Sequence, residues 1–227
     1  LEDLLRMRSG LEFAERYADP ASDVVQSLFA LPDAAGYAAD KPLAQPPGVE
    51  WRYASGTSNL VSRVLRRALE RRGLDYHRFP REALFGPLGM GTAVFETDAA
   101  GTFVGSSFVY AAPRDWARLG QLMLQDGVWE GRRLLPEGWV RFLTSPTPQS
   151  PDGCYGAHWW LKVAREMGGD SEAARRLPPD AYHALGHEAQ CLTVVPSRGL
   201  VVVRMGLSVR VDAWNHAEFL DELLRTV

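Results

Sequence analysis

Hydrophobic periodicity changes near residue 150, and this change limits the folds open to the chain. Before it, apolar residues recur at the spacing of one helix face, which predicts helices over residues 21–30, 59–72, 114–125 and 136–143. After it, short apolar runs predict strands over residues 158–163, 190–195 and 200–207, and residues 214–227 return to a helical pattern. We therefore expect an α+β fold, with a mainly helical region over 1–150 and an antiparallel sheet plus a packed C-terminal helix over 151–227.

The run Val201-Val202-Val203 predicts a strand that is covered on both faces. A sheet of about three such strands needs more strands or a covering layer. The chain also opens at Leu1 directly in a helical pattern. We therefore expect an N-terminal portion of the domain to lie outside these 227 residues.

Composition narrows the classes of partner. The net charge of -3 gives no reason to expect nucleic acid or an anionic membrane surface. No apolar run approaches the length that spans a bilayer. The sequence contains neither a phosphate-binding loop nor a dinucleotide fingerprint, so no cofactor is expected. The sequence does not distinguish among periplasmic, secreted and membrane-attached locations.

A Pro/Gly turn at Pro46-Pro47-Gly48 delivers Tyr53 to the start of the helix predicted over residues 59–72. A phenol has a pKa of about 10, so it acts as a base at neutral pH only when a nearby cation stabilises the phenolate. With such a cation it can take a proton from a serine hydroxyl and return it to a leaving group. Ser55, two residues later, could hydrogen-bond a substrate amide or carbonyl. Alternatively, Tyr53 is a structural residue whose ring is packed and whose hydroxyl is hydrogen-bonded within the fold.

A second polar segment, Gly186-His187-Glu188-Ala189-Gln190, opens the strand predicted over residues 190–195. Backbone N–H groups at such a strand edge suit an oxyanion hole. A histidine bound to a neighbouring carbonyl is the alternative. A zinc site from His183, His187 and Cys191 would need these residues on one helix face, and the strand pattern opposes it. The spacing of Cys154 and Cys191 does not favour a disulfide.

Familiar nucleophile motifs are absent from the chain. The segment Gly56-Thr57-Ser58-Asn59-Leu60 lacks the final glycine of a nucleophile elbow. Ala38 and Trp159 stand three residues before Lys41 and Lys162, the only lysines, so no Ser-x-x-Lys pair occurs. A serine hydrolase built on this chain would need its nucleophile from elsewhere.

Five segments in order nevertheless resemble the class C β-lactamase-related serine hydrolases, which include D,D-peptidases, penicillin-binding-protein-like esterases and nylon-oligomer hydrolases. These segments are residues 4–11, 47–55, 85–90, 155–160 and 186–190. The resemblance implies a β-lactamase/transpeptidase-like fold, an acyl-enzyme mechanism and a small ester, amide or peptide substrate. It also implies a Ser-x-x-Lys just upstream of Leu1, so the chain would pair with that N-terminal segment and be inactive without it.

The resemblance implies roles for particular residues. Tyr53 would be the general base and His187 would assist it or bind a substrate carboxylate. Ser55, Glu188, Ala189 and Gln190 would lie along the substrate, with the Gln190 N–H forming half of the oxyanion hole.

The chain departs from the family pattern at two substrate positions. Ser55 replaces an asparagine, which favours an esterase or amidase over β-lactam recognition. Ala189 replaces a glycine and adds a Cβ beside the substrate. Two alternatives remain: a non-catalytic binding module of the same fold, and an unrelated α+β protein.

Overall fold

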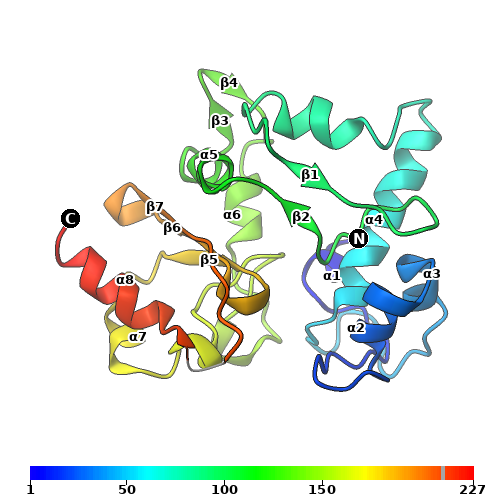
Figure 1. The fold of residues 1–227 in the computed structure, drawn as a ribbon, viewed down its shortest axis with the longest axis horizontal. Coiled ribbons are helices and arrows are strands. Elements are labelled where there is room, and N and C mark those ends of the chain that lie inside the picture. Colours follow the sequence, from blue (N-terminus) through cyan, green and yellow to red (C-terminus); the bar gives the residue numbers. More distant parts are fainter. Residues whose placement is uncertain (211–212) are drawn as a thin grey trace. The chain divides into compact units, whose positions relative to one another are not determined.

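The computed structural model describes residues 1–210 and 213–227, and they form two compact units, Leu1–Ala111 and Ala112–Val227 (Figure 1). The first unit contains α1 (Glu2–Leu5), α2 (Asp23–Val25), η1 (Gln26–Ala30), α3 (Ala34–Ala39), α4 (Ser55–Glu70), η2 (Arg81–Phe85), β1 (Val94–Phe95) and β2 (Val109–Tyr110). The second contains α5 (Pro113–Leu124), β3 (Val128–Trp129), β4 (Arg132–Arg133), α6 (Trp139–Leu143), η3 (Pro151–Gly153), η4 (Arg165–Met167), α7 (Glu172–Arg176), β5 (Tyr182–Leu185), η5 (His187–Ala189), β6 (Cys191–Val195), η6 (Pro196–Arg198), β7 (Leu200–Arg204) and α8 (His216–Leu224).

The second unit is built around a three-stranded antiparallel sheet in the order β5-β6-β7, with β7 at one edge. Side chains alternate between its faces. Cys191 and Val202 pack with α8 in one core cluster, whereas Leu192 and Val194 pack in another with Met123 of α5. The expectation of a strand covered on both faces is thus confirmed. In Figure 1 α8 lies along one side of the sheet.

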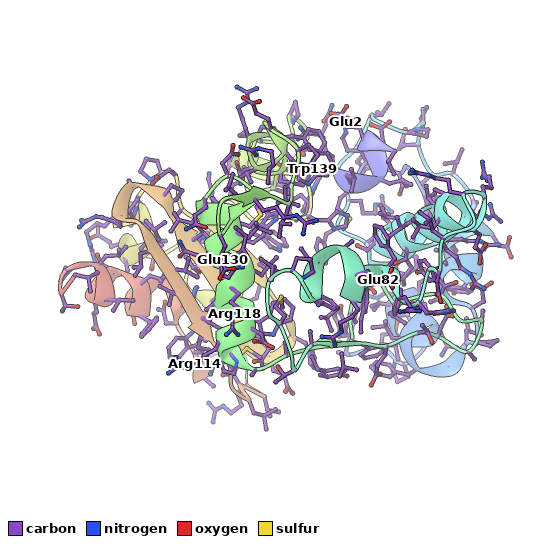
Figure 2. The ribbon with its side chains drawn as sticks, turned by 90° about the horizontal axis from the view of Figure 1, so that it is seen from above. Glu2, Glu82, Arg114, Arg118, Glu130 and Trp139 are labelled. Atoms are coloured by element: carbon purple, nitrogen blue, oxygen red, sulfur yellow. The ribbon has the colours of Figure 1, made fainter. Side chains whose placement is uncertain are left out.

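Helix α5 explains where the units divide. The helix begins with Pro113 at its first turn, where a missing N–H costs nothing. It packs on β6 and β7, so it belongs with the sheet although we expected the helical region to extend to residue 150. Arg114 and Arg118 lie on successive turns of α5 (Figure 2), and Arg118 forms an ion pair with Asp115.

The strand expected over residues 158–163 does not form. The structure has only isolated bridges there, from Trp160 to Tyr155 and to His183. His158 adopts a φ of 59°, which interrupts extended backbone.

Helix α4 begins at Ser55, four residues earlier than expected, and its buried face differs from the predicted apolar stripe. Val64 and Leu65 are exposed, whereas the small polar residues near its start are buried: Ser55, Thr57, Ser58, Asn59 and Ser62. Gly56 explains why this face packs so tightly, because a Cβ there would lie 2.5 Å from the Phe13 ring. The helix ends at Glu70, two residues before the predicted end at residue 72, and Gly73, with a φ of 68°, follows its C-terminal turn.

No helix among the described residues is long and apolar enough to cross a membrane.

Candidate active-site residues

Tyr53 lies in extended backbone immediately before α4. Ala54 is the residue that caps the helix, in β conformation, and the Arg52 N–H donates to the Met7 carbonyl at 2.8 Å. The expected Pro/Gly turn is present, with a φ of 87° at Gly48 and a hydrogen bond from the Val49 N–H to Pro46. The local backbone therefore places Tyr53 at the N-terminal end of a 16-residue helix.

Glu15 binds the first residue of α4 through both carboxylate oxygens. The Ser55 N–H donates to Oε2 at 2.9 Å, and the Ser55 hydroxyl donates to Oε1 at 2.6 Å. The Tyr17 hydroxyl donates to the same Oε1 at 3.1 Å. A carboxylate at a helix N-terminus satisfies an otherwise unpaired N–H and interacts favourably with the helix dipole. Because its proton is committed to Glu15, Ser55 Oγ can meet a substrate only as an acceptor.

Burial dominates the electrostatics of this group. It raises the pKa of Glu15 despite the hydrogen bonds from Ser55. Burial also raises the pKa of Tyr17, to about 12, with the charge of Glu15 adding to the effect. The pKa of Tyr53 is raised by burial first, then by the charges of Tyr17 and Glu15. These influences all favour a neutral phenol at Tyr53, so a phenolate there requires a cation brought close to it.

The segment around His187 forms a tight turn between β5 and β6, not the start of a strand as expected. The Gln190 N–H bonds the His187 carbonyl at 3.3 Å and closes a four-residue turn, in which Glu188 and Ala189 have φ values of 54° and 64°. The left-handed region is unfavourable for residues with a Cβ, so this turn is strained. The His187 side chain is 75% exposed, and its Nε2 lies 3.8 Å from Glu188 Oε1.

Arg204 of β7 holds the strained turn in place. Its Nη1 donates to the carbonyl oxygens of Glu188 at 3.2 Å and Ala189 at 2.8 Å, and its Nη2 donates to Ser208 Oγ at 2.7 Å. The guanidinium also lies 4.6 Å from the ring centroid of Trp214. A planar fork of donors that is stacked on an aromatic ring is well suited to fix two adjacent carbonyls.

Gln190 is held from both its backbone and its side chain. Its N–H donates to the His187 carbonyl at 3.3 Å. Its side-chain amide donates to the Gly206 carbonyl and accepts the Gly206 N–H at 3.0 Å. The group expected in an oxyanion hole is therefore engaged within the turn in this conformation.

The residues of the rejected zinc site are dispersed, and no cluster of three metal-ligating side chains occurs among the described residues. His183 is buried on β5, where its Nδ1 lies 2.8 Å from the Thr193 hydroxyl. Thr193 in turn lies 2.8 Å from His216 Nε2, and the Trp214 N–H donates to His216 Nδ1 at 3.3 Å. Cys154 and Cys191 are free thiols.

The structure thus groups the predicted residues within each unit. Tyr53 and Ser55 lie together with Glu15 and Tyr17 in the first unit, while residues 187–190 form one turn in the second. Sequence reasoning missed Glu15, Tyr17 and Arg204. Glu15 lies 40 positions from Ser55, so only the fold brings them together.

Two sequence comparisons relate this chain to known proteins. A family model described as Beta-lactamase matches residues 1–208. The 6-aminohexanoate-dimer hydrolase of Paenarthrobacter ureafaciens is 27% identical over 178 residues, which are 69% of this chain and 45% of that protein. The chain thus spans about half the length of this curated relative.

Solved structures of low sequence identity share the fold. A Bacillus anthracis structure provisionally assigned as a 6-aminohexanoate-dimer hydrolase superposes with a TM-score of 0.72 at 21% identity, covering 100% of this chain and 62% of that one. Simvastatin synthase (LovD) from Aspergillus terreus gives a TM-score of 0.60 at 18% identity, covering 99% and 65%. The expected α+β, β-lactamase/transpeptidase-like fold is confirmed.

Proposed function

Because the chain belongs to the Beta-lactamase family, we propose that it forms the C-terminal portion of a serine hydrolase that cleaves a small ester or amide through an acyl-enzyme. The nucleophile would come from a Ser-x-x-Lys outside these 227 residues. Its lysine would supply the cation that Tyr53 needs, and Tyr53 would then take the serine proton and return it to the leaving group.

One observation carries the proposal: Tyr53 lies just before α4, beside the half-buried carboxylate of Glu15 that binds Ser55. A general base must lie within hydrogen-bond distance of the proton that it takes, so its position must be suitable before its pKa becomes important. In this proposal Ser55 Oγ accepts an N–H from the substrate, which favours amides over esters. His187, Glu188, Ala189 and Gln190 would bind the acyl portion, and Arg204 would keep their turn in place.

The test is burst kinetics on the chain expressed together with its upstream coding sequence. We expect an activated p-nitrophenyl ester to give a burst followed by slow turnover, and Tyr53→Phe to reduce the burst rate at least 100-fold, in line with loss of a general base. Tyr110→Phe, at a tyrosine that is 52% exposed, is the matched control and should leave the rate unchanged. Full activity of Tyr53→Phe would show that another group is the base.

The alternative is a non-catalytic binding module of the same fold. The engaged N–H of Gln190 and the influences that keep Tyr53 neutral both favour it. An encoding gene without an upstream Ser-x-x-Lys would decide for this alternative.

A further inference from the structure

Helix α4 carries an apolar stripe that is covered at one end and exposed at the other. Leu60 packs against a core cluster of the first unit: Phe13, Val24, Ala38 and Ala54. Val64 and Ala68 follow at intervals of four residues, so they lie on the same side of the helix as Leu60. Both are exposed, Val64 to 44%, and the neighbouring Leu65 is 38% exposed. The stripe thus continues beyond the core that covers its first part.

The opposite side of α4 has partners within the first unit. Leu69 lies in a separate core cluster, and Ser62 is buried on the same side of the helix. Val64, Leu65 and Ala68 form the exposed surface that we call the α4 face. A helix in a globular fold buries its apolar stripe against another element, because apolar surface is unfavourable in water. The α4 face is therefore a candidate docking surface.

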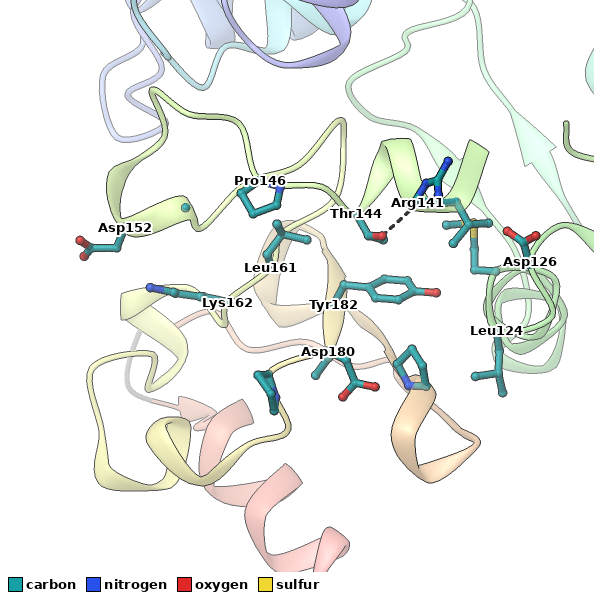
Figure 3. A pocket seen from close by; sticks show the side chains of 16 residues that line it. Leu124, Asp126, Arg141, Thr144, Pro146, Asp152, Leu161, Lys162, Asp180 and Tyr182 are labelled. Atoms are coloured by element: carbon teal, nitrogen blue, oxygen red, sulfur yellow. Dashed lines mark hydrogen bonds between the residues drawn. The ribbon is translucent and has the colours of Figure 1, made fainter. Parts of the chain in front are cut away.

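Arginines border the α4 face near the C-terminal end of the helix. Arg67, Arg71 and Arg72 are exposed, and none forms an ion pair with another described residue. The pocket of about 670 Å³ in the second unit differs (Figure 3), because it is lined by charges of both signs: Asp126, Asp180, Arg141 and Lys162. Positive charge of one sign at the rim of an interface favours a partner with carboxylates.

The first residues of the chain lie along the start of α4. Helix α1 packs on α4, and the Ser9 hydroxyl lies 3.0 Å from Thr57 Oγ1. Leu1 itself is 69% exposed. This chain covers 62% of the Bacillus anthracis structure, so that protein contains residues without a counterpart here. A segment that precedes Leu1 would therefore enter the first unit next to α4.

We propose that the α4 face docks a helix from a segment that precedes Leu1. Apolar side chains of that helix would pack on Val64 and Leu65, and the small Ala68 leaves a groove into which one such side chain can fit. Carboxylates on its flank would lie near Arg71. A second copy of this chain is a poorer occupant, because two sets of the same arginines would then meet in one interface. The inference rests on the proposed function only in requiring a protein that continues upstream of Leu1.

The test measures how fast single cysteines react with a maleimide in the protein expressed with its upstream coding sequence. Val64→Cys and Ala68→Cys each place a thiol on the α4 face. Glu70→Cys is the matched control: Glu70 is also exposed, and because it is two residues from Ala68 it lies on the other side of the helix. Peptide mass spectrometry follows modification at each site, in buffer and in urea.

We expect the two cysteines on the α4 face to react about tenfold more slowly than the control in buffer, because a covered thiol reacts only when its cover opens. All three should react at similar rates in urea. Equal rates in buffer would overturn the proposal. Protection that appears only when phosphatidylserine vesicles are added would also overturn it, in favour of a membrane surface.

Photo-crosslinking identifies the segment that covers the α4 face. A benzophenone amino acid in place of Leu65 should crosslink to a residue upstream of Leu1. Crosslinks between two copies of the protein, or only within the 227 residues, would overturn the proposal.

Burst kinetics on the same preparations separates this inference from the proposed hydrolase activity. Slow labelling of the α4 face in a protein that gives no burst would support the docking surface and count against the hydrolase. A burst together with equal labelling rates would do the reverse.

Arg71→Glu tests the charge complementarity. Combined with Val64→Cys, it should raise the labelling rate about threefold, because a rim charge of the wrong sign weakens docking. Arg132→Glu, at an exposed arginine of β4 in the second unit, is the charge-matched control and should leave the rate unchanged. An unchanged rate in Arg71→Glu would overturn the assignment of an acidic segment.

Discussion

Residues other than glycine with a positive φ mark the positions where the backbone is strained. Glu188 and Ala189 are consecutive examples, and Arg204 donates hydrogen bonds to the carbonyl oxygens of both. The strain is held because the surrounding contacts leave the backbone no alternative. The sequence analysis treated Ala189 only as a Cβ beside the substrate and did not predict the left-handed backbone found there.

Substitutions at Ala189 should report this strain directly. We expect Ala189→Val to lower the free energy of unfolding by at least about 1 kcal/mol, because a β-branched side chain is a severe outlier at a φ of 64°. Ala189→Gly relieves the strain but adds freedom to the unfolded chain, so it should be neutral to slightly stabilising. Urea unfolding of both variants measures the difference. Equal loss in both would mean that the side chain packs there and that strain is not the cause.

Helix α4 contacts its surroundings through small polar residues near its start more than through its apolar residues, whereas α5 buries Leu122 and Met123. The apolar pattern predicted the existence of α4 and α5 and their approximate ends, because helix periodicity is local. It misplaced the buried face of α4, since the small polar residues near its start pack against the fold: the Asn59 side chain accepts the Ser106 N–H at 3.2 Å. Which polar residues find such partners depends on contacts that are distant in sequence.

Gly120 marks the corresponding close contact of α5 on the sheet. A Cβ at this position would lie 2.5 Å from Val201 Cγ1 and 2.8 Å from Leu192 Cδ1. Gly120→Ala should therefore destabilise the second unit by about 1 kcal/mol, since overpacking of 1–3 kcal/mol exceeds the helix-propensity gain of about 1 kcal/mol. The loop variant Gly91→Ala has nothing within 4 Å of the added Cβ and serves as control. A Gly120→Ala protein with unchanged thermal stability would contradict this packing.

At the scale of the whole chain, acid should unfold the second unit through its buried histidines. The indole N–H of Trp214 is only a donor, so His216 Nδ1 accepts and its Nε2 carries the proton donated to Thr193; the Thr193 hydroxyl then donates to His183 Nδ1. Burial lowers the pKa of His183 to about 3, with the charge of His216 adding to it. It lowers that of His216 to about 4, with Arg204 adding to it.

The direction of this pH dependence follows from the lowered pKa values of His183 and His216. Above the unfolded pKa of about 6.5 neither state binds these protons. As pH falls below about 6.5 the unfolded state gains them first, so each histidine removes about 1.4 kcal/mol of stability per pH unit until its folded pKa is reached. Unfolding monitored by tryptophan fluorescence should show this slope, and His216→Phe should reduce it. A His216→Phe slope equal to that of the parent chain would refute the assignment.

The sequence predicted the fold class, strands β6 and β7 and the C-terminal helix, because these depend on local periodicity. It missed β5 and placed a strand over residues 158–163, where none forms. It located Tyr53 and Ser55 by the turn before α4, yet gave no sign of Glu15 or Arg204. Their partners lie 40 positions away for Glu15 and 15 or 16 for Arg204, and are set by folding. The roles of Tyr53, Ser55 and residues 187–190 stay predictions.

Strand β7 has a neighbouring strand on one side only in the sheet formed by the described residues, and its segment Leu200–Val203 contains neither proline nor lysine. Such an edge presents a row of backbone donors and acceptors that can template another chain. When the 227-residue chain is produced alone, a high protein concentration should favour self-association along this edge. Soluble yield would then fall as expression level rises.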